Sequence, residues 1–309
     1  MAANNINPMI LKSARKKVEV VATKLGEDGK EIETRNENAA VFGLATGILI
    51  FFFVMVYGMQ VMRSVMEEKT NRIVEVIISS VKPFQLMMGK IIGVACVGIT
   101  QFLIWVILSF TLTTITSSFM LKTVVNDVQV LQDQNEEVFK QGSNAKFDEM
   151  KSPVSKVEAM SVVKDFYSLN LGEIILCFFV YFLGGYLLYS ALFAAVGSAG
   201  DAEADTQQFM MPVMLPLMAG YMMSFGIMND PESNVAFWGS MIPFTSPIVM
   251  MVRLPFGVPA WQIGVSMLML IIGFIFTTWL AGKIYRTGIL MYGKKITWRE
   301  LGKWLTYRN

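Results

Sequence analysis

Long uncharged stretches alternate with polar segments along the chain, and five of these stretches are long enough to cross a membrane. A helix needs about 20 consecutive apolar residues to span the hydrocarbon core of a bilayer. The predicted spans are residues 38–62, 91–117, 174–200, 206–229 and 254–282. The pattern therefore predicts an all-α, polytopic membrane protein with five transmembrane helices.

A sixth uncharged stretch, residues 233–252, predicts a different structure. Pro243 and Pro247 lie four residues apart in its middle, and Gly239 precedes them. Each proline removes a backbone donor, which the bilayer interior tolerates only where protein or water covers the backbone. We therefore interpret residues 230–253 as a re-entrant, proline-containing hairpin rather than a sixth span.

The polar segments between the spans differ in composition. Residues 17–32 alternate enough for a β-hairpin with Glu27-Asp28-Gly29 as its turn, and residues 118–173 are expected to form two short helices around Pro153. Three segments are predicted outside the cytoplasm: 1–37 as the end of an extracytoplasmic domain, 118–173 as a loop and 230–253 as a hairpin. Three are predicted in the cytoplasm: 63–90 as a segment between spans, 201–205 as a turn and 283–309 as a tail.

The distribution of basic residues predicts this orientation. Residues 63–90 and 283–309 together hold 12 Lys and Arg residues, whereas residues 118–173 hold six and residues 229–253 hold one. Short loops rich in Lys and Arg stay in the cytoplasm. We therefore expect a protein of the plasma membrane, the cytoplasmic membrane of a bacterium, with its N-terminus outside and its C-terminus in the cytoplasm.

Composition supports the membrane assignment and excludes several kinds of chemistry. The chain is 54% hydrophobic and 16% charged, with a net charge of +2 and no histidine. The balanced charge disfavours nucleic acid as a partner, and the absence of histidine excludes Ser-His triads and His-based zinc sites. Cys96 and Cys177 lie in apolar runs and are expected to be packing residues. We predict no catalytic residue, no metal and no cofactor in this chain.

The segment 63–80, RSVMEEKTNRIVEVIISS, has the pattern of an amphipathic helix. Glu68, Arg72 and Glu75 fall on one polar stripe, where Glu68 and Arg72 can pair. The opposite face is apolar except for Lys69, which is expected to extend its ammonium toward water. Two interpretations remain open, a linker helix on the membrane surface and a docking element for a soluble partner.

The same segment resembles the cytoplasmic coupling segment of ATP-binding-cassette permeases of the second exporter type (ABC-2), in particular the sodium-extruding, multidrug-like branch. The resemblance rests on Arg63, Glu67-Glu68-Lys69, Arg72, Glu75, Ser79-Ser80, Pro83 and Gly89-Lys90. Supporting motifs are the turn 202–208, the hairpin motif Pro243-Phe244-Thr245-Ser246-Pro247 and the tail 285–294.

This resemblance implies a permease subunit that pairs with a second copy or a sister permease and with cytoplasmic ABC ATPase subunits, which would bind the ATP and Mg²⁺. By the same resemblance, Glu67, Glu68, Lys69, Arg72 and Glu75 would meet the ATPase, and Pro243 and Pro247 would belong to an outer re-entrant gate. Members of the family usually begin with a first span and a large outer domain, so we expect this sequence to lack its N-terminal span.

Two other classes of function are alternatives to a permease subunit. An ATP-independent channel or secondary carrier should line its path with ionisable residues near the bilayer midplane, and no charged residue lies well inside the five predicted spans. An intramembrane enzyme is disfavoured because the spans contain no pair of aspartates. The motif from Gly288 to Lys294 approaches a phosphate-binding loop but is followed by Lys295 instead of Ser or Thr.

Overall fold

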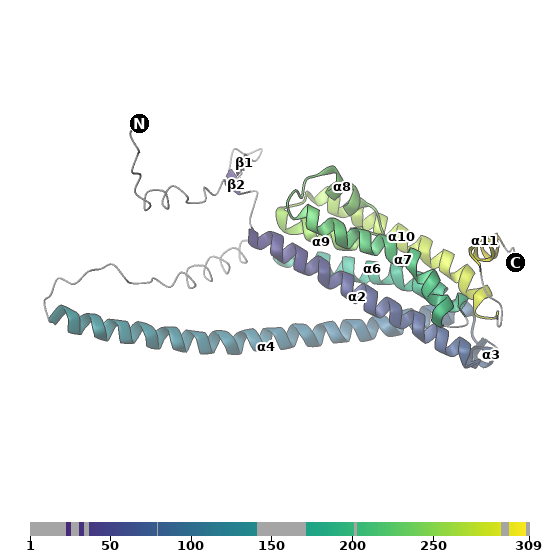
Figure 1. Ribbon diagram of the computed structural model, residues 1–309, viewed down its shortest axis with the longest axis horizontal. Helices are drawn as coiled ribbons and strands as arrows, with labels where there is room; N and C mark the ends of the chain where they lie inside the picture. The colour runs from purple at the N-terminus through teal and green to yellow at the C-terminus, as the bar shows by residue number, and fades with distance from the viewer. Residues whose placement is uncertain are drawn as a thin grey trace, which may run out of the picture.

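The computed structural model describes residues 23–25, 31–33, 37–78, 80–140, 171–200, 203–291 and 297–306. The described residues form five long helices: α2 (Glu37–Thr70), α4 (Pro83–Lys140), α6 (Leu171–Ala199), α7 (Glu203–Ile227) and α10 (Ala260–Gly288). In Figure 1, α2, α6, α7 and α10 run roughly side by side, whereas α4 diverges from them. The short elements are α3 (Ile73–Ile78), α8 (Asn234–Met241), α9 (Ser246–Arg253), the 3₁₀ turn η1 (Leu254–Phe256) and α11 (Trp298–Thr306).

The prediction of five spanning helices is confirmed. Among the described residues, five helices are long and apolar enough to cross a membrane, namely Ala39–Thr70, Pro83–Thr116, Gly172–Ala199, Thr206–Ile227 and Ala260–Gly288. The remaining regular structure is a pair of antiparallel strands, β1 (Thr23–Leu25) and β2 (Glu31–Glu33), in which Leu25 faces Glu31. This register agrees with the predicted hairpin, of which residues 17–22 and 26–30, the latter including the turn, lie outside the described residues.

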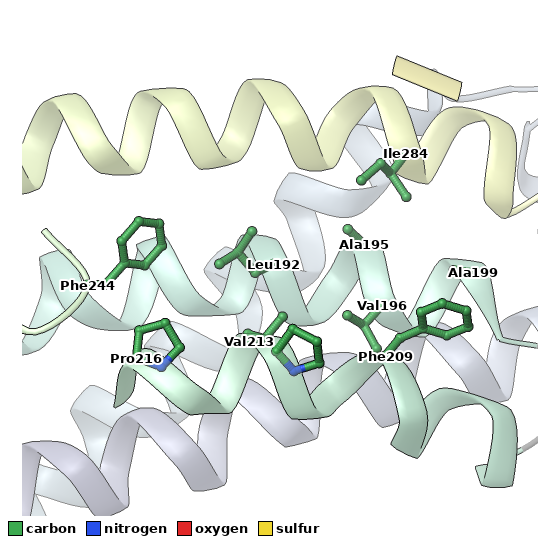
Figure 2. Close-up of a pocket in the computed structure, with 10 residues that line it drawn as sticks. Leu192, Ala195, Val196, Ala199, Phe209, Val213, Pro216, Phe244 and Ile284 are labelled. Carbon is green, nitrogen blue, oxygen red and sulfur yellow. The ribbon is translucent and has the colours of Figure 1, made fainter. Parts of the chain in front are cut away.

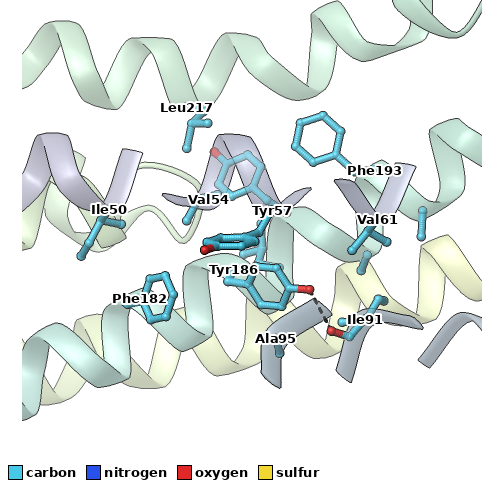
Figure 3. Close-up of a cluster of buried hydrophobic side chains, with 14 of the residues drawn as sticks. Ile50, Val54, Tyr57, Val61, Ile91, Ala95, Phe182, Tyr186, Phe193 and Leu217 are labelled. Carbon is cyan, nitrogen blue, oxygen red and sulfur yellow. Dashed lines mark hydrogen bonds between the residues drawn. The ribbon is translucent and has the colours of Figure 1, made fainter. Parts of the chain in front are cut away.

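Helix α6 forms the centre of the bundle, between α2 and α10. It is the most buried of the five spanning helices, and Tyr186 and Phe193 point from it into the apolar core shown in Figure 3. The Tyr186 hydroxyl donates a hydrogen bond of 2.8 Å to the Ile91 carbonyl of α4. Nearby, the ring of Phe178 stacks on Phe102 and Phe182 with centroid distances of 5.1 and 6.0 Å. Aromatic contacts therefore hold the first half of α4 against α6.

The hairpin between α7 and α10 consists of two short helices, as the sequence predicts for a segment that does not span. Ser233 caps α8 by accepting a hydrogen bond of 3.3 Å from the Ala236 amide, and the Thr245 hydroxyl donates to the Gly239 carbonyl at 2.6 Å. All eight residues of α9 are buried, in contact with α2, α6 and α7. Protein therefore covers the irregular backbone of the hairpin, which is the condition for such backbone at membrane depth.

Glycines allow helix α2 to approach the hairpin closely. A β-carbon placed on Gly43 would lie 2.5 Å from the Val252 carbonyl oxygen, and one on Gly47 would lie 2.6 Å from the Val252 side chain. These two glycines therefore serve contacts within the chain. Gly89 and Gly93, the equivalent pair on α4, have no atom of the described chain within 4 Å of an added β-carbon.

Two helices continue further than the predicted spans do, although the apolar part of α4 ends at Thr116, next to the predicted residue 117. Helix α2 runs without a break beyond residue 62 to Thr70, and α4 runs beyond residue 117 to Lys140, into the segment predicted as a loop. Residues 118–140 contain neither glycine nor proline, so nothing in them ends the helix. The part of that loop around Pro153 lies outside the described residues.

Candidate coupling surface

The predicted coupling segment folds as a sharp turn between α2 and α4. Helix α2 ends at Thr70, and Arg72 adopts a left-handed backbone conformation with φ of 56°. The Arg72 amide donates to the Lys69 carbonyl at 3.0 Å, which closes the helix end. The prediction of one amphipathic helix over residues 63–80 is therefore wrong, because a left-handed residue redirects the chain before α3 begins.

This change of direction also alters which apolar residues face the bundle. Val65 on α2 and Val74 on α3 are fully buried, whereas Ile73 is 46% and Val76 74% exposed. On one continuous helix, Val65, Ile73 and Val76 would lie together on the apolar face. Two exposed aliphatic side chains therefore lie on α3, at the end of the molecule where α2 and α4 are joined (Figure 1).

Lys69 does not extend toward water as predicted. Its side chain is 1% exposed, and its ammonium donates a hydrogen bond of 2.7 Å to the Ser198 carbonyl near the C-terminal end of α6. The last carbonyls of a helix lack partners within the helix and attract positive charge. Lys69 therefore stabilises the end of α6 from inside the bundle.

Glu68 pairs across to α4. Its carboxylate lies 2.7 Å from the Lys90 ammonium, which also donates to the Ser64 carbonyl at 2.8 Å. We call Glu68, Lys69, Lys90 and Ser198 the lysine cluster. Because its members come from α2, α4 and α6, the cluster joins three of the five spanning helices at one end of the bundle.

The five predicted coupling residues thus separate into different environments. Glu67 and Arg72 are exposed, Glu68 is partly buried and Lys69 is fully buried. Glu75 lies on α3, and its side chain is outside the described part of the structure. We call the exposed residues Glu67, Arg72, Ile73 and Val76 the turn surface, and it lies directly beside the lysine cluster in sequence.

A second buried cation lies at the other end of the bundle and was not predicted from the sequence. Arg253, the last residue of α9, is 5% exposed. Its guanidinium donates to the Pro231 carbonyl at 2.9 Å, to the Ser240 hydroxyl at 2.5 Å and to the Gln262 side-chain oxygen at 3.1 Å. Burial lowers the pKa of Arg253, although the charge of Glu232 acts in the opposite direction. Its position as the sole basic residue in residues 229–253 was the available signal.

The two prolines of the predicted gate lie at the tip of the hairpin and on its second helix. Pro243 lies between α8 and α9, and Pro247 is in the first turn of α9. A β-carbon on Gly273 of α10 would approach the Pro243 ring to 2.6 Å, and one on Gly185 of α6 would approach the Pro247 ring to 2.9 Å. The prolines therefore dock the hairpin on glycines of two spanning helices.

Two cavities lie at different depths in the bundle. A polar cavity of about 600 Å³ adjoins Arg253, with Asp230 and Glu232 in its wall. An apolar cavity of about 290 Å³ lies between α6, α7 and α10, and Figure 2 shows Phe209, Val213 and Pro216 of α7 along one side of it. Pro212 also lines the apolar cavity.

The described residues define the class of the protein, a multi-pass α-helical membrane protein with five helices long and apolar enough to span and a buried hairpin. The chain belongs to the ABC-2 family of transporter proteins, whose model matches residues 1–283. This membership agrees with the resemblance carried by the sequence motifs.

Two curated relatives are similar over most of the chain. One is "Uncharacterized protein YhaP" of Bacillus subtilis, 28% identical over 258 residues, which are 82% of this chain and 52% of the relative. The other is "Uncharacterized protein MJ1024" of Methanocaldococcus jannaschii, 25% identical over 244 residues, which are 79% of this chain and 48% of the relative. The chain spans about half the length of these relatives. No solved structure matches it.

Proposed function

We propose that this permease belongs to an ATP-driven exporter and that a separate cytoplasmic ATPase subunit docks on the turn surface. The observation that carries the proposal is the exposure of Ile73 and Val76 on α3, next to the charged residues Glu67 and Arg72. Exposed aliphatic residues rimmed by charges are typical of protein-protein contacts. The proposal places the turn surface, the tail and the bound ATP and Mg²⁺ on the cytoplasmic side of the plasma membrane.

The lysine cluster supplies a mechanical connection for this proposal. A displacement of α3 acts first on the end of α2, where Glu68 contacts Lys90 of α4 and Lys69 contacts Ser198 of α6. Buried polar contacts of this kind resist separation because each broken contact leaves an unpaired group in an apolar environment. The ATPase would therefore move three spanning helices together rather than α2 alone.

The docking test compares one substitution at two ends of the molecule. Val76→Asp places a charge on the turn surface, and Val235→Asp places the same charge on α8, where Val235 is 57% exposed. The tagged permease is purified from its host membranes, and co-purified subunits with ATPase motifs are quantified by mass spectrometry. We expect Val76→Asp to reduce recovery of the ATPase by at least tenfold and Val235→Asp to leave it unchanged.

Two outcomes would contradict the proposal. Equal ATPase recovery from both variants would exclude the turn surface as the docking site. Solute movement in vesicles that contain the permease and a second copy or sister permease, but no ATPase, would indicate the alternative function, an ATP-independent channel or secondary carrier.

The apolar cavity between α6, α7 and α10 supports an apolar cargo path through this permease. Its lining, including Leu192, Val213 and Phe244, offers dispersion contacts and no charged group. Val213→Trp fills this space, whereas Met211→Trp changes a side chain of α7 that is 66% exposed. We expect the first variant to reduce ATP-dependent export while the second leaves it intact, and equal export by both would remove the cavity from the path.

A further inference from the structure

Helix α10 has one exposed apolar stripe along its length. Leu268, Ile272, Phe276 and Trp279 are between 52% and 56% exposed and follow one another at intervals of three or four residues. The opposite face, which includes Leu270 and Tyr285, is buried against the bundle. Helix α10 is long and apolar enough to span the membrane, and the described part of the bundle leaves this stripe uncovered.

The stripe ends in two cations. Lys283 and Arg286 continue the same spacing beyond Trp279, and the Lys283 ammonium lies 4.3 Å from the centroid of the Trp279 ring. Helix α11 packs beside this end of α10 through the buried Trp304 and adds the exposed residues Arg299 and Lys303. Figure 1 places α11 at this end of α10. The Glu300 carboxylate accepts a hydrogen bond from the Thr297 amide at 3.3 Å.

The other end of α10 has a similar aromatic residue in a different electrostatic setting. Trp261 is 59% exposed, which matches the 54% of Trp279. Its neighbour along the chain is Gln262, and the nearest preceding cation, Arg253, is buried among its own hydrogen-bond partners. Among the described residues, the same helix therefore offers an aromatic contact with nearby cations at the Trp279 end and without exposed cations beside it in the chain at the Trp261 end.

We propose that the end of α10 at Trp279, Lys283 and Arg286 is a binding site for an anionic phospholipid. The acyl chain lies along Ile272 and Phe276, the glycerol region contacts Trp279, and the headgroup phosphate binds Lys283 and Arg286. Charge complementarity favours an anionic lipid over a zwitterionic one, by roughly fivefold for each cation near the surface. The site depends on the spanning position of α10 and is independent of the ATPase.

Tryptophan quenching by brominated lipids tests the site in the full chain. The protein is reconstituted in nanodiscs of unlabelled lipid that contain a small fraction of phosphatidylglycerol or phosphatidylcholine, each brominated on the acyl chain near the headgroup. The fluorescence of the Trp279→Phe or Trp261→Phe variant is subtracted from that of the parent protein, which isolates the signal of the replaced residue among the six tryptophans. We expect phosphatidylglycerol to quench Trp279 at least tenfold more effectively at low mole fraction, and the two lipids to quench Trp261 equally.

The charge variants connect the preference to the named residues. The measured ratio is the quenching of Trp279 by phosphatidylglycerol divided by that by phosphatidylcholine. The double variant Lys283→Gln with Arg286→Gln is expected to reduce this ratio to about one, and Arg286→Gln alone to reduce it by about fivefold. Trp261 quenching in the same samples reports that α10 keeps its place in the membrane. The proposal is overturned if both lipids quench Trp279 equally in the parent protein, if the preference survives the double substitution, or if neither lipid reaches Trp279 because another protein surface covers it.

Discussion

Both ends of the helix bundle bury a cation, but they use different side chains for different connections. At one end the Lys69 ammonium binds the Ser198 carbonyl of α6, and the neighbouring Glu68 binds Lys90 of α4. At the other end the Arg253 guanidinium donates to three separate segments through Pro231, Ser240 and Gln262. An ammonium is a compact charge with rotating donors, whereas a guanidinium is a planar fork with fixed directions.

The difference indicates which end holds a fixed geometry and which end can pass on a movement. The bonds of Arg253 fix the loop before α8, α8 itself and α10 in one arrangement, and Ser266 adds a hydrogen bond of 2.6 Å to the Ser240 carbonyl. The lysine cluster instead joins the ends of long helices directly beside the exposed turn surface. We therefore interpret the hairpin end as the static end of the permease.

The largest expected effect comes from Arg253→Ala. It leaves the Pro231 carbonyl and the Gln262 side chain without their donor, which costs about 3 kcal/mol of unfolding free energy. Thermal unfolding is followed by reaction of the buried Cys177 with a thiol dye in a Cys96→Ala background, because Cys96 is exposed. Arg253→Lys should recover less than half of the loss, and full recovery by lysine would show that the fork geometry is unimportant.

Lys69→Ala should have the next largest effect, a loss of about 2 kcal/mol, because it opens a cavity and removes the donor of the Ser198 carbonyl. Lys69→Met restores the volume and should regain much of this stability. ATP-dependent export by Lys69→Met should nevertheless fall if the contact transmits movement from the turn surface. Normal export by this variant, with normal stability, would leave Lys69 a purely structural role.

The ion pair between Glu68 and Lys90 is expected to contribute less, since Glu68 is 27% exposed in its side chain. A double-mutant cycle with Glu68→Gln and Lys90→Gln should give a coupling energy of about 1 kcal/mol. The measurement is the same dye assay on the two single variants and the double variant. A coupling energy near zero would indicate that this ion pair adds nothing to the contact between α2 and α4.

Tyr285→Phe should have the smallest effect. The Tyr285 hydroxyl is buried and has no hydrogen-bond partner in the described part of the chain. Its removal is therefore expected to change the unfolding free energy by less than about 0.5 kcal/mol, or to raise it slightly. A loss above about 1 kcal/mol in the dye assay would reveal that this hydroxyl has a hydrogen-bond partner in the folded protein.

The spans could be predicted from the sequence because they depend on a local property, the length of an uncharged stretch. The hairpin could also be predicted, since Pro243 and Pro247 disfavour a sixth span whatever surrounds them. The environment of the predicted coupling residues could not be predicted from the sequence. Lys69 is buried because the Ser198 carbonyl, 129 residues later in the chain, lies within reach of its ammonium, and periodicity carries no information about that contact.

The turn between α2 and α3 shows how one backbone angle can interrupt a helix that the sequence periodicity predicts. Residues 63–80 fit one amphipathic helix, yet Arg72 adopts the left-handed backbone conformation, which residues other than glycine and asparagine seldom use. Such a conformation is stable when tertiary contacts outside the segment favour the changed direction of the chain. Here the redirected chain buries Val74 and exposes Ile73 and Val76, so the apolar side chains available to a partner differ from those on the predicted face.

The continuation of α4 determines how far the permease extends from the membrane. Its apolar part ends at Thr116, and the helix then continues to Lys140. At 1.5 Å per residue this adds as much as about 36 Å, which is comparable to the roughly 30 Å of the hydrocarbon core itself. Figure 1 shows α4 extending well past the other helices. A molecule bound at Lys140 would therefore stand about one membrane thickness away from the lipid.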